Sequence, residues 1–129
     1  MNKDIQNDVK QFLVDRGWDK LRPGDLAKSI SIEAAELLEH FQWSNPDLGE
    51  VKSDEAKMIE IKKELSDVMI YALQMAALLE LDATSIISAK LAKAAEKYPA
   101  ELMMAREGVG PGAEDAYLKI KKEYRQQGK

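Results

Sequence analysis

The chain has 129 residues, with 19 Lys and Arg against 23 Asp and Glu, so its formal charge is −4 at pH 7. That length suits one compact domain of about 100–150 residues. Because the sequence has no cysteine, it excludes a disulfide framework, a thiolate-ligated metal and a cysteine nucleophile. Its one histidine, His40, excludes a site built from several histidines. Any chemistry is therefore expected to depend on carboxylates and on cations that prefer oxygen ligands.

Charge and hydropathy also predict a location and a class of partner. The acidic balance argues against a nucleic acid polymer, whose binding proteins usually carry a basic stripe. The N-terminal sequence MNKDIQNDVKQFLVDRGW lacks the apolar stretch of a secretory signal. The longest apolar stretch, residues 68–81, contains Gln74 and Glu80 and is shorter than the roughly 20 residues that span a bilayer. We therefore expect a cytoplasmic protein with no membrane partner.

Apolar residues recur with helical spacing along almost the whole chain, which predicts an all-α protein of the four-helix-bundle type. The predicted helices cover, in chain order, residues 5–17, 26–42, 54–81 and 83–97. The turn at residues 22–24 precedes Asp25, which is predicted to cap the second helix. The sequence Ser44-Asn45-Pro46 is expected to stop that helix, and residues 47–53 to form a loop.

A glycine-rich stretch at residues 108–112 divides the sequence into a body, residues 1–107, and a C-terminal part, residues 108–129. Residues 113–127 carry an apolar stripe at Tyr117, Ile120 and Tyr124, which predicts a short helical tail. This tail is either loose or docked on a partner subunit.

Two predicted helices carry acidic residues where core residues are expected. Glu33 and Glu36, three residues apart, lie on the apolar stripe of the second helix, and Glu64 and Asp67 repeat the pattern in the third. If the two helices pack antiparallel along these stripes, the four carboxylates converge. Clustered carboxylates repel one another, and desolvation adds to the cost, so divalent cations would relieve both. Oxygen ligands select hard ions, with Mg²⁺ first and Mn²⁺ as a substitute.

Other interpretations of these acidic pairs stay open. Acidic pairs at this spacing are common on solvated helix faces, and Glu60 is interpreted as a surface residue of this kind. A di-iron carboxylate bundle also uses facing helices, but it needs a Glu-x-x-His on each of two of them. Here His40 follows Glu36 by four residues, so that interpretation is poor, and we take His40 as a surface residue.

Aromatic and basic residues add a second layer to the pattern. Trp18 and Trp43 bracket the second predicted helix, and each is either a core anchor or a platform on which a nucleobase stacks. Lys90, Lys93 and Lys97 fall on one face of the fourth helix. They form either a solvated stripe or, beside a magnesium site, the partners of phosphate oxygens.

Taken together, these residues resemble the MazG-like superfamily of all-α nucleoside triphosphate pyrophosphohydrolases, and its dCTP pyrophosphatase branch in particular. The family signature is Glu-x-x-Glu, a spacer and Glu-x-x-Asp. The matching motifs are Ser31–Leu37, Phe41–Trp43, Glu64–Val68 with Tyr71, and Lys97–Pro99. The resemblance covers roughly residues 12–99 and does not extend to the tail.

The resemblance implies Mg²⁺-dependent hydrolysis of a nucleoside triphosphate, dCTP or a similar one, between its α- and β-phosphates, which gives a monophosphate and pyrophosphate. It makes residues 1–107 the pyrophosphohydrolase domain of a homodimer or of a homotetramer made of two dimers, with the pocket completed across a subunit contact. The metal ligands it implies are Glu33, Glu36, Glu64 and Asp67. The substrate contacts it implies are Trp18 and Trp43 on the base, and Tyr71 and Lys90 on the phosphates or sugar.

The chain departs from the dCTP branch at two positions. Ala94 aligns with an Asn that binds phosphate in that branch, and Val9 is the nearest match to a His of its first helix. We expect Lys93 or Lys97 to supply the phosphate contact that Ala94 lacks. These departures favour an alternative function, a nucleotide-binding or regulatory helical module with weak catalysis. A plain helical interaction protein with solvent-exposed acidic pairs is a third possibility.

The catalytic base is expected among the same acidic residues. A metal-bound water loses its proton more easily, and a nearby carboxylate can accept that proton. Glu36 and Glu39 are the two candidates. Glu36 is preferred, because Glu39 is as well suited to buttressing the site.

Overall fold

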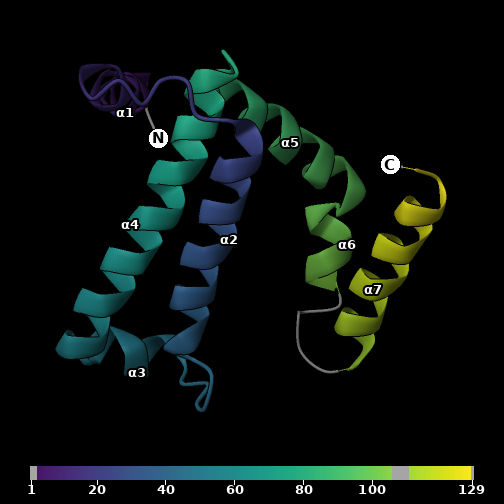
Figure 1. Cartoon of the computed structure of the whole chain (residues 1–129). Coiled ribbons are helices and arrows are strands. Elements are labelled where there is room, and N and C mark those ends of the chain that lie inside the picture. The colour runs from purple at the N-terminus through teal and green to yellow at the C-terminus, as the bar shows by residue number, and fades with distance from the viewer. Residues whose placement is uncertain (1–2, 106–110, 129) are drawn as a thin grey trace. The chain divides into compact units, whose positions relative to one another are not determined.

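The computed structural model of the chain describes residues 3–105 and 111–128 (Figure 1). No strand occurs in these two ranges, which confirms the predicted all-α class. The helices are α1 (Lys3–Asp15), α2 (Pro23–Glu39), α3 (Leu48–Ser53), α4 (Glu55–Leu78), α5 (Ala83–Lys97), α6 (Ala100–Ala105) and α7 (Pro111–Gln126). They divide between two compact units, Met1–Thr84 and Ser85–Lys129.

The first unit is built around α2 and α4, which lie side by side and run in opposite directions (Figure 1). α1 packs on α4, and the short α3 contacts the same helix. The buried apolar side chains of this unit are Leu13, Leu26, Leu73, Ala76, Ala77 and Ala83. Leu26 lies in the N-terminal half of α2, and three others, Leu73, Ala76 and Ala77, lie in the C-terminal half of α4. The apolar core therefore occupies one end of the α2–α4 pair, and the acidic residues lie beyond it.

A single side chain of α1 holds the turn between α4 and α5. The Gln6 amide nitrogen donates a hydrogen bond to the Leu81 carbonyl oxygen at 2.6 Å, and its carbonyl oxygen accepts one from the Ala83 N–H at 2.9 Å. Leu81 and Ala83 lie at the predicted boundary between the third and fourth helices. The bridge ties the segment that follows α4 to α1.

The start of α2 corrects one prediction. The helix begins at Pro23, and its N-cap residue is Arg22, which makes no side-chain capping hydrogen bond. The prediction that Asp25 caps this helix is wrong, because the fixed φ of proline suits the first helical position and so moves the start upstream. Asp25 lies in the first turn, where a carboxylate interacts favourably with the helix dipole.

Residues 47–53 form a helix, contrary to the predicted loop. The Asp47 carboxylate accepts a hydrogen bond from the Glu50 N–H at 2.9 Å and so caps α3. In the same way, the Asp54 carboxylate accepts from the Lys57 N–H at 3.0 Å and caps α4. Sequence reasoning missed this capping chemistry. α2 also ends earlier than predicted, at Glu39.

α4 ends at Leu78, three residues before its predicted end. The Glu80 N–H donates to the Ala77 carbonyl at 3.1 Å, and the Leu81 N–H donates to the Ala76 carbonyl at 2.8 Å. These two bonds form a Schellman motif, which places the residue after the C-cap in the left-handed region. That residue is Glu80, with a φ of 58°. A side chain at this position is strained, because such a conformation suits glycine.

The second unit pairs α6 with α7 and confirms that the C-terminal segment is helical. The rings of Tyr98 and Tyr117 stack with centroids 5.0 Å apart, and the Lys97 ammonium lies 5.0 Å from the centre of the Tyr124 ring. α6 was not predicted. Of the predicted glycine-rich linker, residues 108–110 lie outside the described residues, as does the proposed domain boundary at residue 107, whereas Pro111 and Gly112 begin α7.

Within the described residues, no single helix is long and apolar enough to cross a membrane. Only the bent pair of α4 and α5, taken together, has the length and composition to do so.

Candidate metal centre

Ionisable side chains face each other along the contact between α2 and α4. Glu33 approaches Asp67, Glu36 approaches Glu64, and the α2 C-cap residue His40 approaches Glu60. Each step of three or four residues forward on α2 is matched by a similar step backward on α4, as expected of antiparallel helices. Of the six, Glu64 is buried, Glu60 is exposed and the other four are partly buried.

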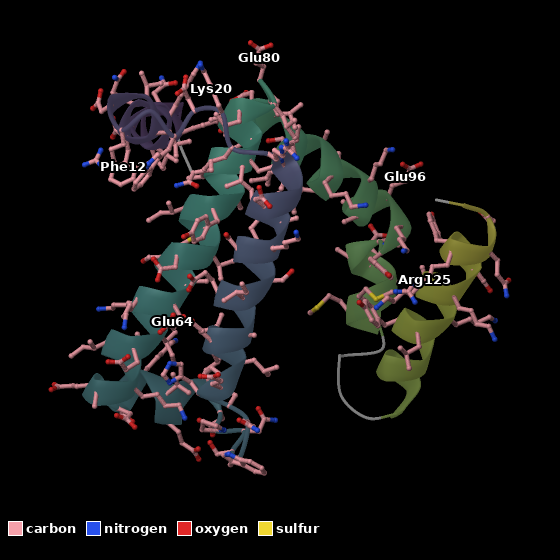
Figure 2. All side chains as sticks on the ribbon, in the orientation of Figure 1. Phe12, Lys20, Glu64, Glu80, Glu96 and Arg125 are labelled. Atoms are coloured by element: carbon pink, nitrogen blue, oxygen red, sulfur yellow. The ribbon has the colours of Figure 1, made fainter. Side chains whose placement is uncertain are left out.

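Three of these side chains form a tight oxygen cluster. One carboxylate oxygen each from Glu33, Glu64 and Asp67 lies within 4.8 Å of the other two. Glu36 lies beside them, close enough for its carboxyl group to raise the pKa of both Glu33 and Glu64. Figure 2 shows Glu64 midway along the helix pair, on the side of α4 that faces α2. The structure thus brings together all four predicted metal ligands.

The cluster is electrostatically unfavourable as it stands. Glu64 is only 6% exposed, and one oxygen each of Glu33 and Glu64 is buried without a hydrogen-bond partner. Burial raises the pKa of both carboxyls above the usual 4.5, and the neighbouring Glu36 raises the pKa values further. Lys63 lowers the pKa of Glu64 but does not reverse the shift. Buried oxygens that lack donors are what a hard divalent cation would satisfy.

Glu64 belongs to a second group of ligand atoms as well. One atom each from His40, Glu60 and Glu64 lies within 4.8 Å of the other two. Sequence reasoning treated His40 and Glu60 as surface residues; Glu60 is indeed exposed and His40 is partly buried, and the grouping of both with Glu64 was missed. The signal was present, since His40 follows Glu33 by seven residues and Glu60 precedes Glu64 by four. The structure therefore places ligand atoms on both sides of the Glu64 carboxylate.

A cavity of about 490 Å³ opens beside the carboxylate cluster, between α1, α2 and α4. Asp67 lines both the cavity and the cluster, while Trp18 and Tyr71, two of the predicted substrate contacts, line the cavity. Trp18 is half-exposed, and the edge of its ring contacts Phe12 with centroids 6.0 Å apart. The volume lies in the range of small-molecule sites, which is about 300–1,000 Å³.

Other predicted site residues are not gathered here. Trp43 is 89% exposed and follows the far end of α2, so it does not line the cavity. Glu39 is exposed at the last position of α2 and joins neither group of ligand atoms. The three predicted phosphate-binding lysines, Lys90, Lys93 and Lys97, belong to α5 in the second unit. Among them Lys97 packs against two tyrosine rings, and the other two are exposed.

Comparison with known proteins gives a consistent result. A family model described as MazG-like matches residues 28–108. The proteins named dCTP pyrophosphatase 1 from Rattus norvegicus and Homo sapiens are each 29% identical to the chain over 102 residues. The matched region covers 78% of this chain and 60% of each relative. The chain thus spans somewhat less than two thirds of the length of these relatives.

One solved structure also resembles the chain closely. It is the crystal structure of a pyrophosphatase from Archaeoglobus fulgidus, with a TM-score of 0.65 and 37% sequence identity. The match covers 75% of this chain and 91% of that protein.

Proposed function

This chain belongs to the MazG-like family, and we propose that it is a metal-dependent nucleoside triphosphate pyrophosphohydrolase. It cleaves a substrate such as dCTP between the α- and β-phosphates and releases a monophosphate and pyrophosphate. The observation that carries the proposal is the convergence of Glu33, Glu64 and Asp67, with two buried unpartnered oxygens, beside a cavity that Asp67 and Trp18 line. The named relatives, which act as pyrophosphatases, support the reaction type.

The four clustered carboxylates would hold the cation, and their oxygen-only donor set fits Mg²⁺, or Mn²⁺ in its place. When bound, such a cation neutralises phosphate charge and lowers the pKa of a water. Glu36 lies beside Glu33 and Glu64 and is the carboxylate that accepts the proton of the attacking water. Glu39 is the alternative base, although its exposed position on α2 supports it less.

The cavity supports the binding of a base and a sugar next to the carboxylates. Trp18 offers an indole face on which a base stacks, a contact worth about 1–3 kcal/mol. Tyr71 lies one helical turn beyond Asp67 on α4, so its hydroxyl is suited to the sugar or to a phosphate. Trp43 and the lysines of α5 remain predicted substrate contacts, with Lys93 or Lys97 in place of the absent Asn.

We propose a homodimer, or a homotetramer made of two dimers, as the working form. A groove of about 520 Å³ between α1 and α4 is almost wholly apolar and lies open. The apolar side chains that line it are Ile5, Val9, Phe12, Met69, Ile70 and Leu73. An open apolar surface of this kind supports a contact with a second copy of the chain. The cytoplasmic location and the absence of membrane and nucleic acid partners stay predictions.

Pyrophosphate release from a panel of nucleoside triphosphates, measured with Mg²⁺ and with EDTA, tests the proposal. We expect release only with the metal, with equal amounts of monophosphate and pyrophosphate. Release of inorganic phosphate with a diphosphate would contradict the cleavage position. Tight nucleotide binding by a folded protein that releases nothing would favour the alternative, a nucleotide-binding module.

A further inference from the structure

Gln74 is a buried polar residue that neither the metal centre nor the proposed reaction uses. Its side chain is 5% exposed, and its carbonyl oxygen Oε1 is buried without a hydrogen-bond partner. A buried acceptor that lacks a donor is unfavourable, and native proteins seldom keep one without a reason. The same side chain lines the cavity of about 490 Å³ described above.

Gln74 lies at the opposite end of the cavity from the carboxylates. Asp67, Tyr71 and Gln74 follow each other at i, i+4 and i+7, so they share one face of α4, and all three line the cavity. Seven residues of helix separate Asp67 from Gln74 by about 10 Å along the axis. A nucleotide whose phosphates lie near Asp67 would extend its sugar past Tyr71 and its base toward Gln74.

Among the described residues that line the cavity, the buried polar atom without a partner is a hydrogen-bond acceptor, the Gln74 Oε1. The cavity is also lined by Asp25, whose carboxylate lies 3.8 Å from the Lys28 ammonium, and by Ser29, whose hydroxyl can accept or donate. No Lys, Arg or His is among its lining residues within the described part of the chain. A base edge that carries an amino group would meet these acceptors, whereas a base edge with a carbonyl oxygen in the same place would oppose them.

We propose that Gln74 is a specificity-determining residue whose side-chain carbonyl accepts a hydrogen bond from the exocyclic amino group of the nucleobase. The site then favours cytosine or adenine over thymine or uracil. This inference rests on the proposed function, because it takes the bound molecule to be a nucleoside triphosphate.

Pairs of substrates that differ by one amino group isolate this contact. The first pair is dCTP and its analogue with hydrogen in place of the 4-amino group, and the second is dATP and the analogue without the 6-amino group. The protein is compared with Gln74→Met, which keeps the length of the side chain but lacks the amide. Gln11→Met is the matched control, because Gln11 is exposed on α1, outside the cavity, where it donates to Asp15 at 2.7 Å.

We expect the unmodified protein to prefer the amino-bearing member of at least one pair by about tenfold or more in kcat/KM, since a site built to bond a group rejects an analogue without it. The preference should reside mainly in KM, because the base lies away from the reacting phosphates. Gln74→Met should lose most of it by binding the amino-bearing nucleotide less well, and Gln11→Met should keep it.

Equal preference in the unmodified protein and in Gln74→Met, with both active, would overturn the inference and leave the proposed function intact. If the unmodified protein releases no pyrophosphate from any nucleotide, the proposed function fails instead. The inference is then decided by calorimetric binding of dCTP and its 4-hydrogen analogue, and equal affinities overturn it.

Thermal unfolding without nucleotide separates this role from a structural one. Methionine removes an unpartnered buried polar atom, so Gln74→Met should unfold at the same temperature as the unmodified protein or at a higher one. A clear drop in Tm would mean that Gln74 has a partner within the folded protein, which contradicts the proposal.

Discussion

The two ends of the α2–α4 pair share one antiparallel helix contact, but one end buries apolar side chains and the other buries carboxylates. At one end Leu26, Leu73 and Ala76 bury apolar surface and stabilise the fold. Along the rest of the pair, Glu33 and Glu64 take equivalent positions but bury carboxylate oxygens that have no donors. The contrast teaches that the first end holds the helices together, while the second lowers stability unless something offsets its buried charge.

The largest expected effect comes from removing a charge at the acidic end. Asp67→Asn keeps the side-chain volume but removes one clustered carboxylate charge, so pyrophosphate release should fall by about 100- to 1,000-fold. Helical circular dichroism should be unchanged, because Asp67 contributes no apolar burial. An active Asp67→Asn protein would place the reaction elsewhere.

Truncating a side chain at the apolar end should lower stability and leave the reaction unchanged. Leu73 is buried in the core and does not line the cavity beside the carboxylates, so Leu73→Ala should lower the free energy of unfolding by about 2–5 kcal/mol. Because Leu73 also lines the α1–α4 groove proposed as the subunit contact, activity per folded molecule should stay close to normal at protein concentrations high enough to keep the subunits associated. Urea unfolding followed by ellipticity, alongside an assay at low temperature, checks both statements. A fully stable but inactive variant would show that the two ends do not have separate roles.

The pH dependence of the metal-free protein should separate the acidic end from the core. Glu33 and Glu64 have pKa values raised above the usual 4.5, so the folded protein holds protons that the unfolded chain releases. Their contribution to stability is therefore present below pH 4.5 and is lost as the pH rises through the folded pKa values. In EDTA, the Tm of Glu64→Gln should increase relative to the Tm of the unmodified protein as the pH rises from about 5 to 8. If the Tm of Glu64→Gln instead falls relative to that of the unmodified protein as the pH rises, the pKa values of Glu33 and Glu64 are not raised in the folded protein.

The smallest expected effect lies where α4 ends, outside both regions. Glu80 adopts a left-handed conformation with φ of 58°, so Glu80→Gly should relieve strain and stabilise the protein by about 0.5–1 kcal/mol. Activity should not change, because Glu80 lines neither the cavity nor the carboxylate cluster. A calorimetric Tm at a fixed protein concentration measures the gain. A lower Tm would mean that the Glu80 side chain makes a stabilising contact.

The acidic pairs could be predicted from the sequence because each breaks an apolar stripe within its own helix. His40 and Glu60 could not be assigned in that way, since they become neighbours of Glu64 only through the antiparallel register of two helices. The cavity was also out of reach, because it needs α1 and the segment that carries Trp18 to fold over α4. Gln74 was noticed only as an interruption of an apolar run. Gln74 is a polar residue among apolar ones, just as Glu33 is, so the same pattern marks both residues.

The central claim is that the carboxylates between α2 and α4 hold a divalent cation, and a magnesium titration followed by thermal unfolding tests it most directly. A ligand that binds only the native state raises Tm as its concentration rises. We expect Mg²⁺ to raise the Tm of the unmodified protein steadily and to leave that of Glu64→Gln almost unchanged. An equal rise in both proteins, or no rise in the unmodified one, would contradict the account.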